Sequence, residues 1–259
     1  MSTIETPFGS FELNIEKSPI DNRDYIAEAI YGDGDLPSEY STVNELMPIR
    51  DQGSQGTCAA QTAACMKEWQ ERKEIDFQDY MSPQFVYNNR SNQDGSGMYM
   101  RDVMKILNKQ GICPEQLYPY GTFDEISDDI YTEAKKHVIK TYASVQTIEG
   151  LKKAIYSDGP CLIAVPVYNY GMRMWKPEID QSMIGGHAMT VVGWTTTGFI
   201  IRNSWSDRWG DKGYTIFPWA DWGLQWETWT TVDASNGSVL TSVPWYKKIW
   251  RFIVKLFGF

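Results

Sequence analysis

The hydrophobic pattern of the chain changes once, near residue 142, and this change limits the folds that the sequence can adopt. From Cys58 to Tyr142, apolar residues recur three and four apart, a spacing typical of helices that bury one face. Beyond Val145 the apolar runs are shorter and are separated by Gly and Pro, as in an antiparallel sheet. These runs are CLIAVPVY, HAMTVVGW, GFIIRNSW and GYTIFPW. We therefore expect an α+β fold with a helical lobe, an antiparallel sheet or barrel lobe, and a cleft between them.

Composition divides the chain further. The expected segments are an extended lead-in (1–40), a mainly helical lobe (41–142), an antiparallel β lobe (143–235) and a basic tail (236–259). The lead-in is rich in Asp, Pro, Gly and Ser, and we expect it to cross the surface. Within the helical lobe, Ser82-Pro83 favours a helix start and Gly111 favours a helix end.

Charge and residue usage exclude several kinds of site. The net charge is -9, whereas a nucleic-acid binder needs a basic face for phosphate contacts. With only two histidines and no paired CxxC spacing, we expect neither a metal site nor a cofactor. The four cysteines lie singly, which is typical of free thiols in a reducing compartment, although disulfide bridges stay open.

The chain shows neither a secretory signal nor an apolar run near the ~20 residues that span a bilayer. We therefore expect a cytoplasmic protein, with association to a virion or membrane surface as the alternative.

The segment RDQGSQGTCA, residues 50–59, is the first to suggest chemistry. Its glycines favour a tight loop, and Thr57 is a candidate N-cap. The small and apolar residues that follow predict a buried helix starting at Cys58, where the positive end of the helix favours a thiolate. On these residues alone, Cys58 is either a nucleophile or a small buried side chain.

A thiolate nucleophile needs a base, and the chain has two histidines. His137 lies in a charged helical stretch, so we expect it to face solvent. His187 begins a predicted strand after two glycines, which leave room beside its ring. Asn203 would orient that ring, and Trp205 would shield their hydrogen bond from water. A turn asparagine and an ordinary core tryptophan are the alternatives.

From residue 52 to about residue 233 the chain resembles the papain-like cysteine peptidases. The resemblance rests on QGSxGxC around Cys58, HAMTVVGW from His187, and RNSWxxxWGxxGY around Asn203. The two later residues follow the cysteine by 129 and 145 positions, close to the family's spacing of about 130–150. The resemblance implies a papain-like two-lobe fold and hydrolysis of peptide bonds in a peptide or protein substrate, most simply by an endopeptidase.

The same resemblance assigns roles to single residues. Cys58 would be the nucleophile, His187 its general base and later acid, and Asn203 the group that orients the imidazole. The side-chain amide of Gln52 and the backbone N–H of Cys58 would form the oxyanion hole. Residues 118–120 are similar to the family's YPY segment.

Three positions depart from the family's CGSCW signature: Gln55, Thr57 and Ala59 replace a cysteine, a small residue and a large aromatic residue. All four chemical roles remain filled, which favours an active enzyme. The alternative is a papain-fold structural or interaction protein, virion- or membrane-associated, with weak or no activity. An exopeptidase or transpeptidase outcome of the same chemistry also stays open.

The resemblance further implies a substrate groove. Its expected residues are Gly95, Gly97, Met98, Met100, Ala188 and Trp205. The glycines would pair with substrate backbone, and the methionines and alanine would line an apolar pocket.

The two ends of the chain carry their own expectations. The lead-in, with SPIDNRDY and LPSEYS, resembles that of propeptide-poor bacterial and phage-encoded members. It is either a stabilising wrap or a removable plug in the cleft. Residues 245–257 separate basic from apolar side chains on a helical wheel, which suits an anionic membrane surface or a protein partner. Docking of this helix on the body is the alternative.

Overall fold

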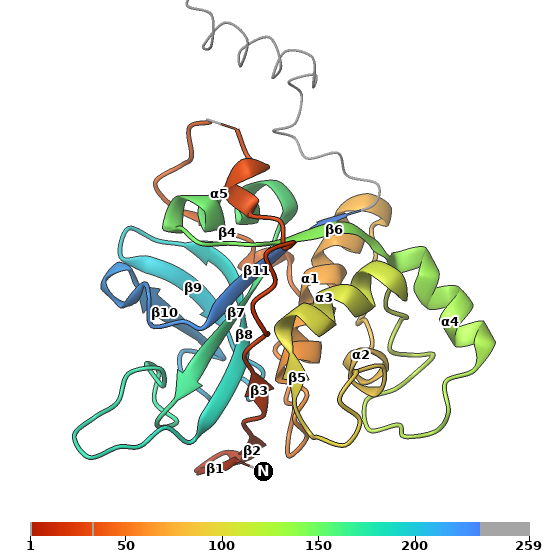
Figure 1. Cartoon of the computed structure of the whole chain (residues 1–259), viewed down its shortest axis with the longest axis horizontal. Helices are drawn as coiled ribbons and strands as arrows, with labels where there is room; N and C mark the ends of the chain where they lie inside the picture. Colours follow the sequence, from red (N-terminus) through yellow and green to blue (C-terminus); the bar gives the residue numbers. More distant parts are fainter. Residues whose placement is uncertain (1, 33, 234–259) are drawn as a thin grey trace, which may run out of the picture.

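A computed structural model describes residues 2–32 and 34–233, and it has the two predicted lobes (Figure 1). A twisted sheet forms one lobe and a cluster of helices forms the other, so the expected α+β architecture is confirmed. The basic tail, with the helix predicted at 245–257, lies outside the described residues. No helix among the described residues is long and apolar enough to cross a membrane.

The helical lobe is built around one long, largely buried helix, α1. Its helices are α1 (Cys58–Ile75), α2 (Pro83–Asn88), α3 (Met100–Lys109) and α4 (Asp128–Ala134). The predicted start of α2 is correct, because the Ser82 hydroxyl accepts a hydrogen bond from the backbone N–H of Phe85 at 3.0 Å. The predicted stop is also correct: α3 ends just before Gly111, whose φ is +77°.

His137 is buried, so the prediction that it faces solvent is wrong. It closes the short 3-10 turn η3 (Lys135–His137), in which the two lysines are exposed and the histidine points inward. Its Nδ1 lies 2.9 Å from a carboxylate oxygen of Glu71 on α1, and its ring packs beside Phe77. His137 therefore ties the end of α4 to the central helix.

The β lobe is a seven-stranded sheet in the order β10-β9-β8-β7-β11-β6, with β4 paired to β8. The bounds are β4 (Tyr40–Ser41), β6 (Ile139–Ser144), β7 (Cys161–Val167), β8 (Gly185–Trp194), β9 (Gly198–Arg202), β10 (Tyr214–Pro218) and β11 (Glu227–Asp233). All neighbouring strands are antiparallel. The helix α5 (Ile148–Asp158) packs against β8 and β11. Strand β6 crosses residue 142, so the sheet begins slightly before the change in hydrophobic pattern.

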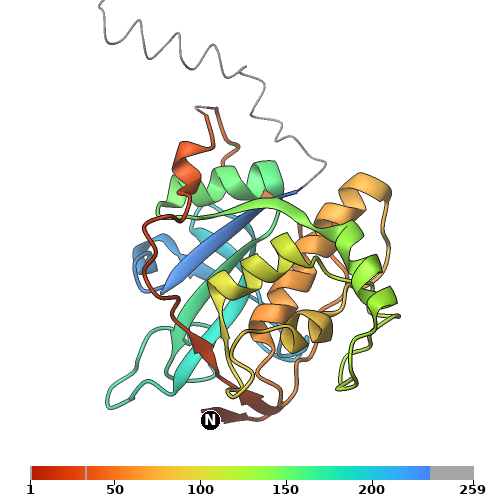
Figure 2. The ribbon, with the colours of Figure 1, turned by 45° about the vertical axis from the view of Figure 1, so that its right-hand side comes forward.

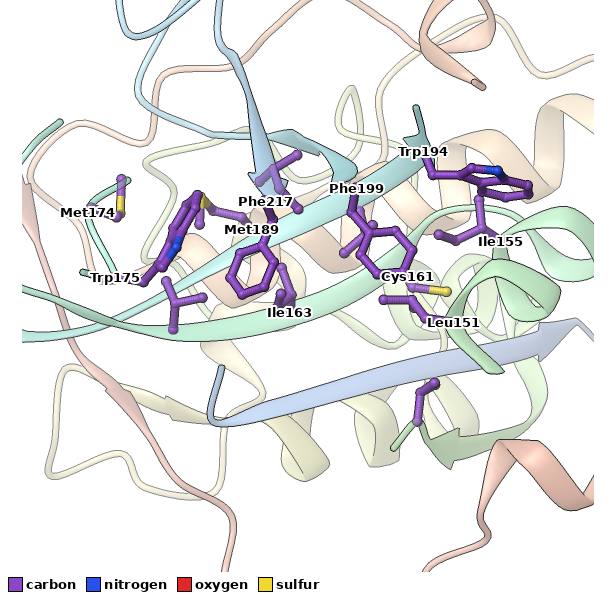
Figure 3. Packing of buried hydrophobic residues seen from close by; sticks show 14 of the residues in the cluster. Leu151, Ile155, Cys161, Ile163, Met174, Trp175, Met189, Trp194, Phe199 and Phe217 are labelled. Carbon is purple, nitrogen blue, oxygen red and sulfur yellow. The ribbon is translucent and has the colours of Figure 1, made fainter. Parts of the chain in front are cut away.

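Large aromatic side chains fill the core of the β lobe (Figure 3). Trp175 and Phe217 lie with their ring centroids 4.7 Å apart, while Trp194 and Phe199 fill the end nearer α5. Each of these four residues is almost completely buried. This packing gives β8 and β9, the strands that carry the candidate site, a rigid support.

The lead-in is more ordered than a surface wrap. It contains β1 (Thr3–Thr6), β2 (Gly9–Glu12), β3 (Ile15–Glu16) and the 3-10 turn η1 (Ala27–Ala29). The hairpin of β1 and β2 leads into β3, which runs between the two lobes in both views (Figures 1 and 2). Strand β3 pairs in parallel with β5 (Met98–Tyr99), which belongs to the helical lobe. On the other side, Asn14 forms a parallel bridge with Gly186.

Candidate active site

Cys58 is the first residue of α1, as predicted. The loop before it turns at Gly53, whose φ of +55° suits glycine. Thr57 occupies the N-cap position, but its side chain makes no capping hydrogen bond; the hydroxyl lies 2.8 Å from that of Tyr120 instead. The expected cap is therefore wrong in its chemistry, although the helix starts where it was predicted to start.

His187 lies on β8, and Asn203 follows the end of the neighbouring strand β9. The Nε2 atom of His187 lies 2.7 Å from Oδ1 of Asn203. The backbone N–H of Ser204 also donates to Oδ1, at 2.8 Å. Because a backbone N–H can only donate, Oδ1 is the carbonyl oxygen of the amide, and Nε2 of the neutral imidazole must carry the proton. Nδ1 is then the unprotonated nitrogen, and it has no hydrogen-bond partner among the described residues.

The thiol lies beside this histidine. The backbone N–H of Ala188, the residue after His187, donates to the sulfur of Cys58. Trp205 covers the imidazole, with the two ring centroids 4.6 Å apart, as the sequence predicts. The thiol at the start of α1 is therefore beside a histidine whose ring is oriented by an amide, the arrangement expected of a nucleophile and its base.

Both reactive groups are buried, and burial favours their neutral forms. Cys58 and His187 each have 0% exposure. Burial raises the pKa of Cys58 to about 12, outweighing the hydrogen bonds that lower it. Burial lowers the pKa of His187 to about 4, although the hydrogen bond to Asn203 raises it. In this arrangement the pair is a thiol and a neutral imidazole over a wide pH range.

Gln52 is held on several sides. Its backbone N–H donates to the Ser204 carbonyl at 2.8 Å, and its Oε1 accepts from the Ser204 hydroxyl at 2.7 Å. Its Nε2 donates one hydrogen to the Gln55 carbonyl at 3.1 Å. The second hydrogen of the same amide has no acceptor among the described residues, so it is available to an oxyanion.

Most of the residues expected in the substrate groove come together. Met98, Met100 and Ala188 are fully buried in one apolar cluster with Ile15 of the lead-in. Gly97 lies against the lead-in backbone, and Trp205 lies beside the imidazole. Gly95 is in the preceding turn, where the Arg90 guanidinium donates to its carbonyl.

The lead-in lies between the two lobes, beside the candidate site (Figures 1 and 2). The Asn14 carbonyl accepts a hydrogen bond from the backbone N–H of Met98 at 3.3 Å. A Cβ atom added to Gly97 would collide with that same carbonyl. A Cβ on Gly186 would likewise meet the Ile15 carbonyl. The lead-in backbone therefore lies directly against the backbone of both lobes, on one side next to His187.

Aromatic residues of the lead-in cover the other end of the site. The ring of Phe11 stacks on Trp205, with centroids 4.8 Å apart and an interplanar angle of 16°. Phe8 packs edge-on against Tyr170, and the Arg208 guanidinium donates to the Phe8 carbonyl at 2.8 Å. One sequence signal could have located this contact: Phe11, Leu13 and Ile15 alternate with polar residues, as in a half-buried strand.

No cluster of three or more His, Cys, Asp and Glu residues suited to a metal ion occurs within the described ranges. The four cysteines are all buried free thiols.

A helix-borne cysteine, a strand-borne histidine oriented by asparagine, and a nearby glutamine amide define the class of cysteine peptidases. Residues 36–219 match the family described as Papain family cysteine protease. The chain belongs to this family, and it is a papain-like cysteine peptidase.

Individual peptidases are similar to this chain in sequence and in structure. An uncharacterized peptidase C1-like protein of Acanthamoeba polyphaga mimivirus is 29% identical over 226 residues, which are 75% of this chain and 73% of that protein. Cathepsin K of Mus musculus is 27% identical over 215 residues, 75% of this chain and 64% of the cathepsin. The crystal structure of xylellain, a cysteine protease from Xylella fastidiosa, has a TM-score of 0.74 and 25% identity, covering 89% of this chain and 99% of xylellain.

The buried, neutral His187 predicts a specific dependence of stability on pH. An unfolded histidine takes up a proton below about pH 6.5, whereas His187 resists protonation until about pH 4. The free energy of unfolding should therefore fall as the pH drops from about 6.5 to 4, by up to about 3 kcal/mol from this group. Above pH 6.5 the same group should contribute no pH dependence.

Urea unfolding at pH 7.5 and 4.5 measures this effect. In His187→Gln the free energy of unfolding should decrease less between pH 7.5 and 4.5 than in the wild type. His137→Gln is the matched control, and it should keep the part of the decrease that His187 causes. An identical loss of stability on acidification in the wild type and in His187→Gln would contradict the prediction.

Proposed function

We propose that Cys58, His187, Asn203 and Gln52 are the catalytic residues of a cysteine endopeptidase. The hydrogen bond of 2.7 Å between His187 and Asn203 carries the assignment, because it leaves Nδ1 as the base. The position of the Cys58 sulfur against the Ala188 amide supports the pairing of thiol and imidazole.

In the proposed reaction, Nδ1 of His187 takes the thiol proton, and the thiolate attacks the substrate carbonyl carbon. The resulting oxyanion accepts hydrogen bonds from the free Gln52 amide hydrogen and from the Cys58 backbone N–H. The imidazolium then protonates the leaving amine, the C–N bond breaks, and a thioester remains. His187 next removes a proton from water, which attacks the thioester, releases the acid and restores the thiol.

An endopeptidase is favoured because the cleft accepts a continuous chain. The lead-in passes from Phe11, stacked on Trp205, to Ile15, enclosed by Met98, without a chain end at the site. A substrate that followed the same path would extend beyond the reacting centre in both directions. Burial of Ile15 further supports a preference for a branched aliphatic side chain at that pocket.

The described arrangement corresponds to a latent form of the enzyme. The exposed fraction of Cys58 and of His187 is 0%, and that of Gln52 is 1%, so a substrate carbonyl has no access to them. The lead-in covers them and excludes the water that would stabilise an ion pair. Displacement of residues 8–16 would open the groove, solvate the site and favour the thiolate–imidazolium pair.

Opening the cleft should activate the thiol. In the full chain, Phe11→Ala together with Ile15→Ala removes two buried apolar anchors of the lead-in, each contributing about 2–5 kcal/mol. Labelling of Cys58 by a thiol-directed epoxide should accelerate at least about 100-fold, which is about 2.7 kcal/mol. Mass spectrometry after timed labelling measures the rate.

Ile20→Ala is the matched control, because Ile20 belongs to the same segment but is 95% exposed. Its labelling rate should equal that of the wild type. Equal rates in the wild type and the double variant would show that the lead-in does not restrict access, and the latent form would be rejected.

Cys58→Ala in this opened full chain should abolish peptide hydrolysis, lowering kcat at least about 10⁴-fold, because the proposed acyl-enzyme forms on the Cys58 sulfur. Cys113→Ala removes a buried thiol outside the site and should leave hydrolysis unchanged. Hydrolysis of a fluorogenic peptide with an internal scissile bond measures both. Cleavage by the Cys58→Ala protein at the parent rate would disprove the assignment.

The amphipathic tail at residues 245–257 supports a further proposal, binding to an anionic membrane surface. The evidence is its sequence, in which Lys247, Lys248, Arg251 and Lys255 share one sector of the helical wheel. Sedimentation with vesicles containing phosphatidylserine should fall strongly when these four residues become Gln, and uncharged vesicles are the control. Equal sedimentation of both proteins would contradict it.

The cytoplasmic location stays a prediction.

A further inference from the structure

Tyr120, the last residue of the YPY segment, contacts both ends of the loop that precedes the nucleophile. Its hydroxyl donates to the Gln52 carbonyl at 2.6 Å. It also lies 2.8 Å from the Thr57 hydroxyl. Since the single phenolic hydrogen goes to a carbonyl, which can only accept, the Thr57 hydroxyl must donate to Tyr120. Burial raises the pKa of Tyr120 to about 12, so the phenol keeps its proton at neutral pH.

Gln52 and Thr57 determine where the two expected oxyanion donors lie. One donor is the Gln52 side-chain amide, and the other is the backbone N–H of Cys58, which directly follows Thr57. Ser204 holds Gln52 from the β lobe through two hydrogen bonds. Tyr120 holds the same residue from the helical lobe and reaches the residue before the nucleophile as well.

The hydrogen bond between Thr57 and Tyr120 replaces the capping bond that a threonine at this position would make to its own helix. A threonine at an N-cap ordinarily accepts a hydrogen bond from the first turn of its helix. Here the side chain makes no such bond and is turned to Tyr120. The backbone of Thr57 still holds the loop to the helix, because its N–H donates to the Gln55 carbonyl and its carbonyl accepts from the Gln61 N–H, both at 2.8 Å.

We infer that Tyr120 is a positioning residue that sets the spacing between the two oxyanion donors. This inference rests on the proposed catalytic roles of Gln52 and Cys58. Tyr120 touches neither reacting atom; its hydroxyl acts by clamping the Gln52 carbonyl and the Thr57 hydroxyl at one point. Loss of the clamp should leave the thiol–imidazole pair intact and misplace the donors.

Tyr118 provides a matched control in the same segment. Its hydroxyl donates to the Asp124 carbonyl at 2.5 Å and accepts from the Asn88 side-chain amide at 2.7 Å. Removing it also deletes one hydroxyl with two hydrogen bonds, but away from the loop at 52–57. A general loss of stability would thus affect Tyr118→Phe and Tyr120→Phe alike.

Steady-state kinetics in the opened full chain, Phe11→Ala with Ile15→Ala, tests the role in catalysis. Tyr120→Phe should lower kcat about 10- to 100-fold, because small displacements of positioned groups are costly, while KM changes less than about threefold. A peptide aldehyde, whose hemithioacetal oxygen uses the same donors, should bind weaker by the same factor. Alkylation by iodoacetamide, which uses no oxyanion donor, should proceed at the parent rate. Tyr118→Phe should keep all four values.

A double-mutant cycle with Gln52→Ala separates positioning from a merely structural role. If Tyr120 acts through the Gln52 amide, the effect of Tyr120→Phe on kcat should shrink at least about fivefold once that amide is gone. An undiminished effect in the Gln52→Ala background, or an effect shared by Tyr118→Phe, would overturn the inference.

Hydrogen exchange of the unopened full chain provides a readout that needs no activity. Amides in peptides covering residues 50–60 should exchange at least about tenfold faster in Tyr120→Phe than in the unopened wild type. In Tyr118→Phe their exchange rate should equal that of the wild type. Unchanged exchange in Tyr120→Phe would overturn the clamp. An inactive parent with the expected exchange pattern would contradict the proposed function instead, so the two failures are distinguishable.

Discussion

The carboxamide oxygen of Asn203 is the atom on which the arrangement of the site depends. It accepts from His187 and from the Ser204 backbone, and the second bond fixes the identity of the amide oxygen. That identity determines which imidazole nitrogen can act as a base. The Ser204 hydroxyl then donates to the Gln52 side chain, so one short segment after β9 orients both the His187 ring in the β lobe and the glutamine amide in the loop before α1. The two lobes are thus joined by the same groups that would perform the chemistry.

Burial works against that chemistry in the described arrangement. The amino end of a helix favours a thiolate, but a helix end contributes only a fraction of what full desolvation costs a charge. Burial therefore favours the neutral forms of Cys58 and His187, and the proposed latent form assigns this burial to the lead-in. In the proposed latent form, the reactive state needs water as well as geometry, so all four side chains can stay in place while the thiol is unreactive.

The sequence predicts those parts of the fold that local patterns encode. The start of α2 at Ser82, the end of α3 before Gly111 and the strands around His187 follow from capping, glycine and hydrophobic period. Local patterns fail where a distant residue competes. The Thr57 hydroxyl bonds to Tyr120, 63 residues away, rather than capping its own helix, and His137 turns from its charged neighbours to α1. The sequence does not determine the path of the lead-in for the same reason, since its partners come from separate segments of both lobes.

The glycines that contact the lead-in have one further consequence. Because Gly97 and Gly186 have no side chains, the lead-in backbone lies directly against the backbone of both lobes, so a substrate in the proposed groove would have to replace these contacts as well as those of Phe11 and Ile15. A tethered segment of this kind acts at an effective concentration of roughly millimolar. In the proposed latent form, a free peptide with micromolar affinity for the groove would compete with a segment of the same chain, and dilution of the protein would not weaken that competition.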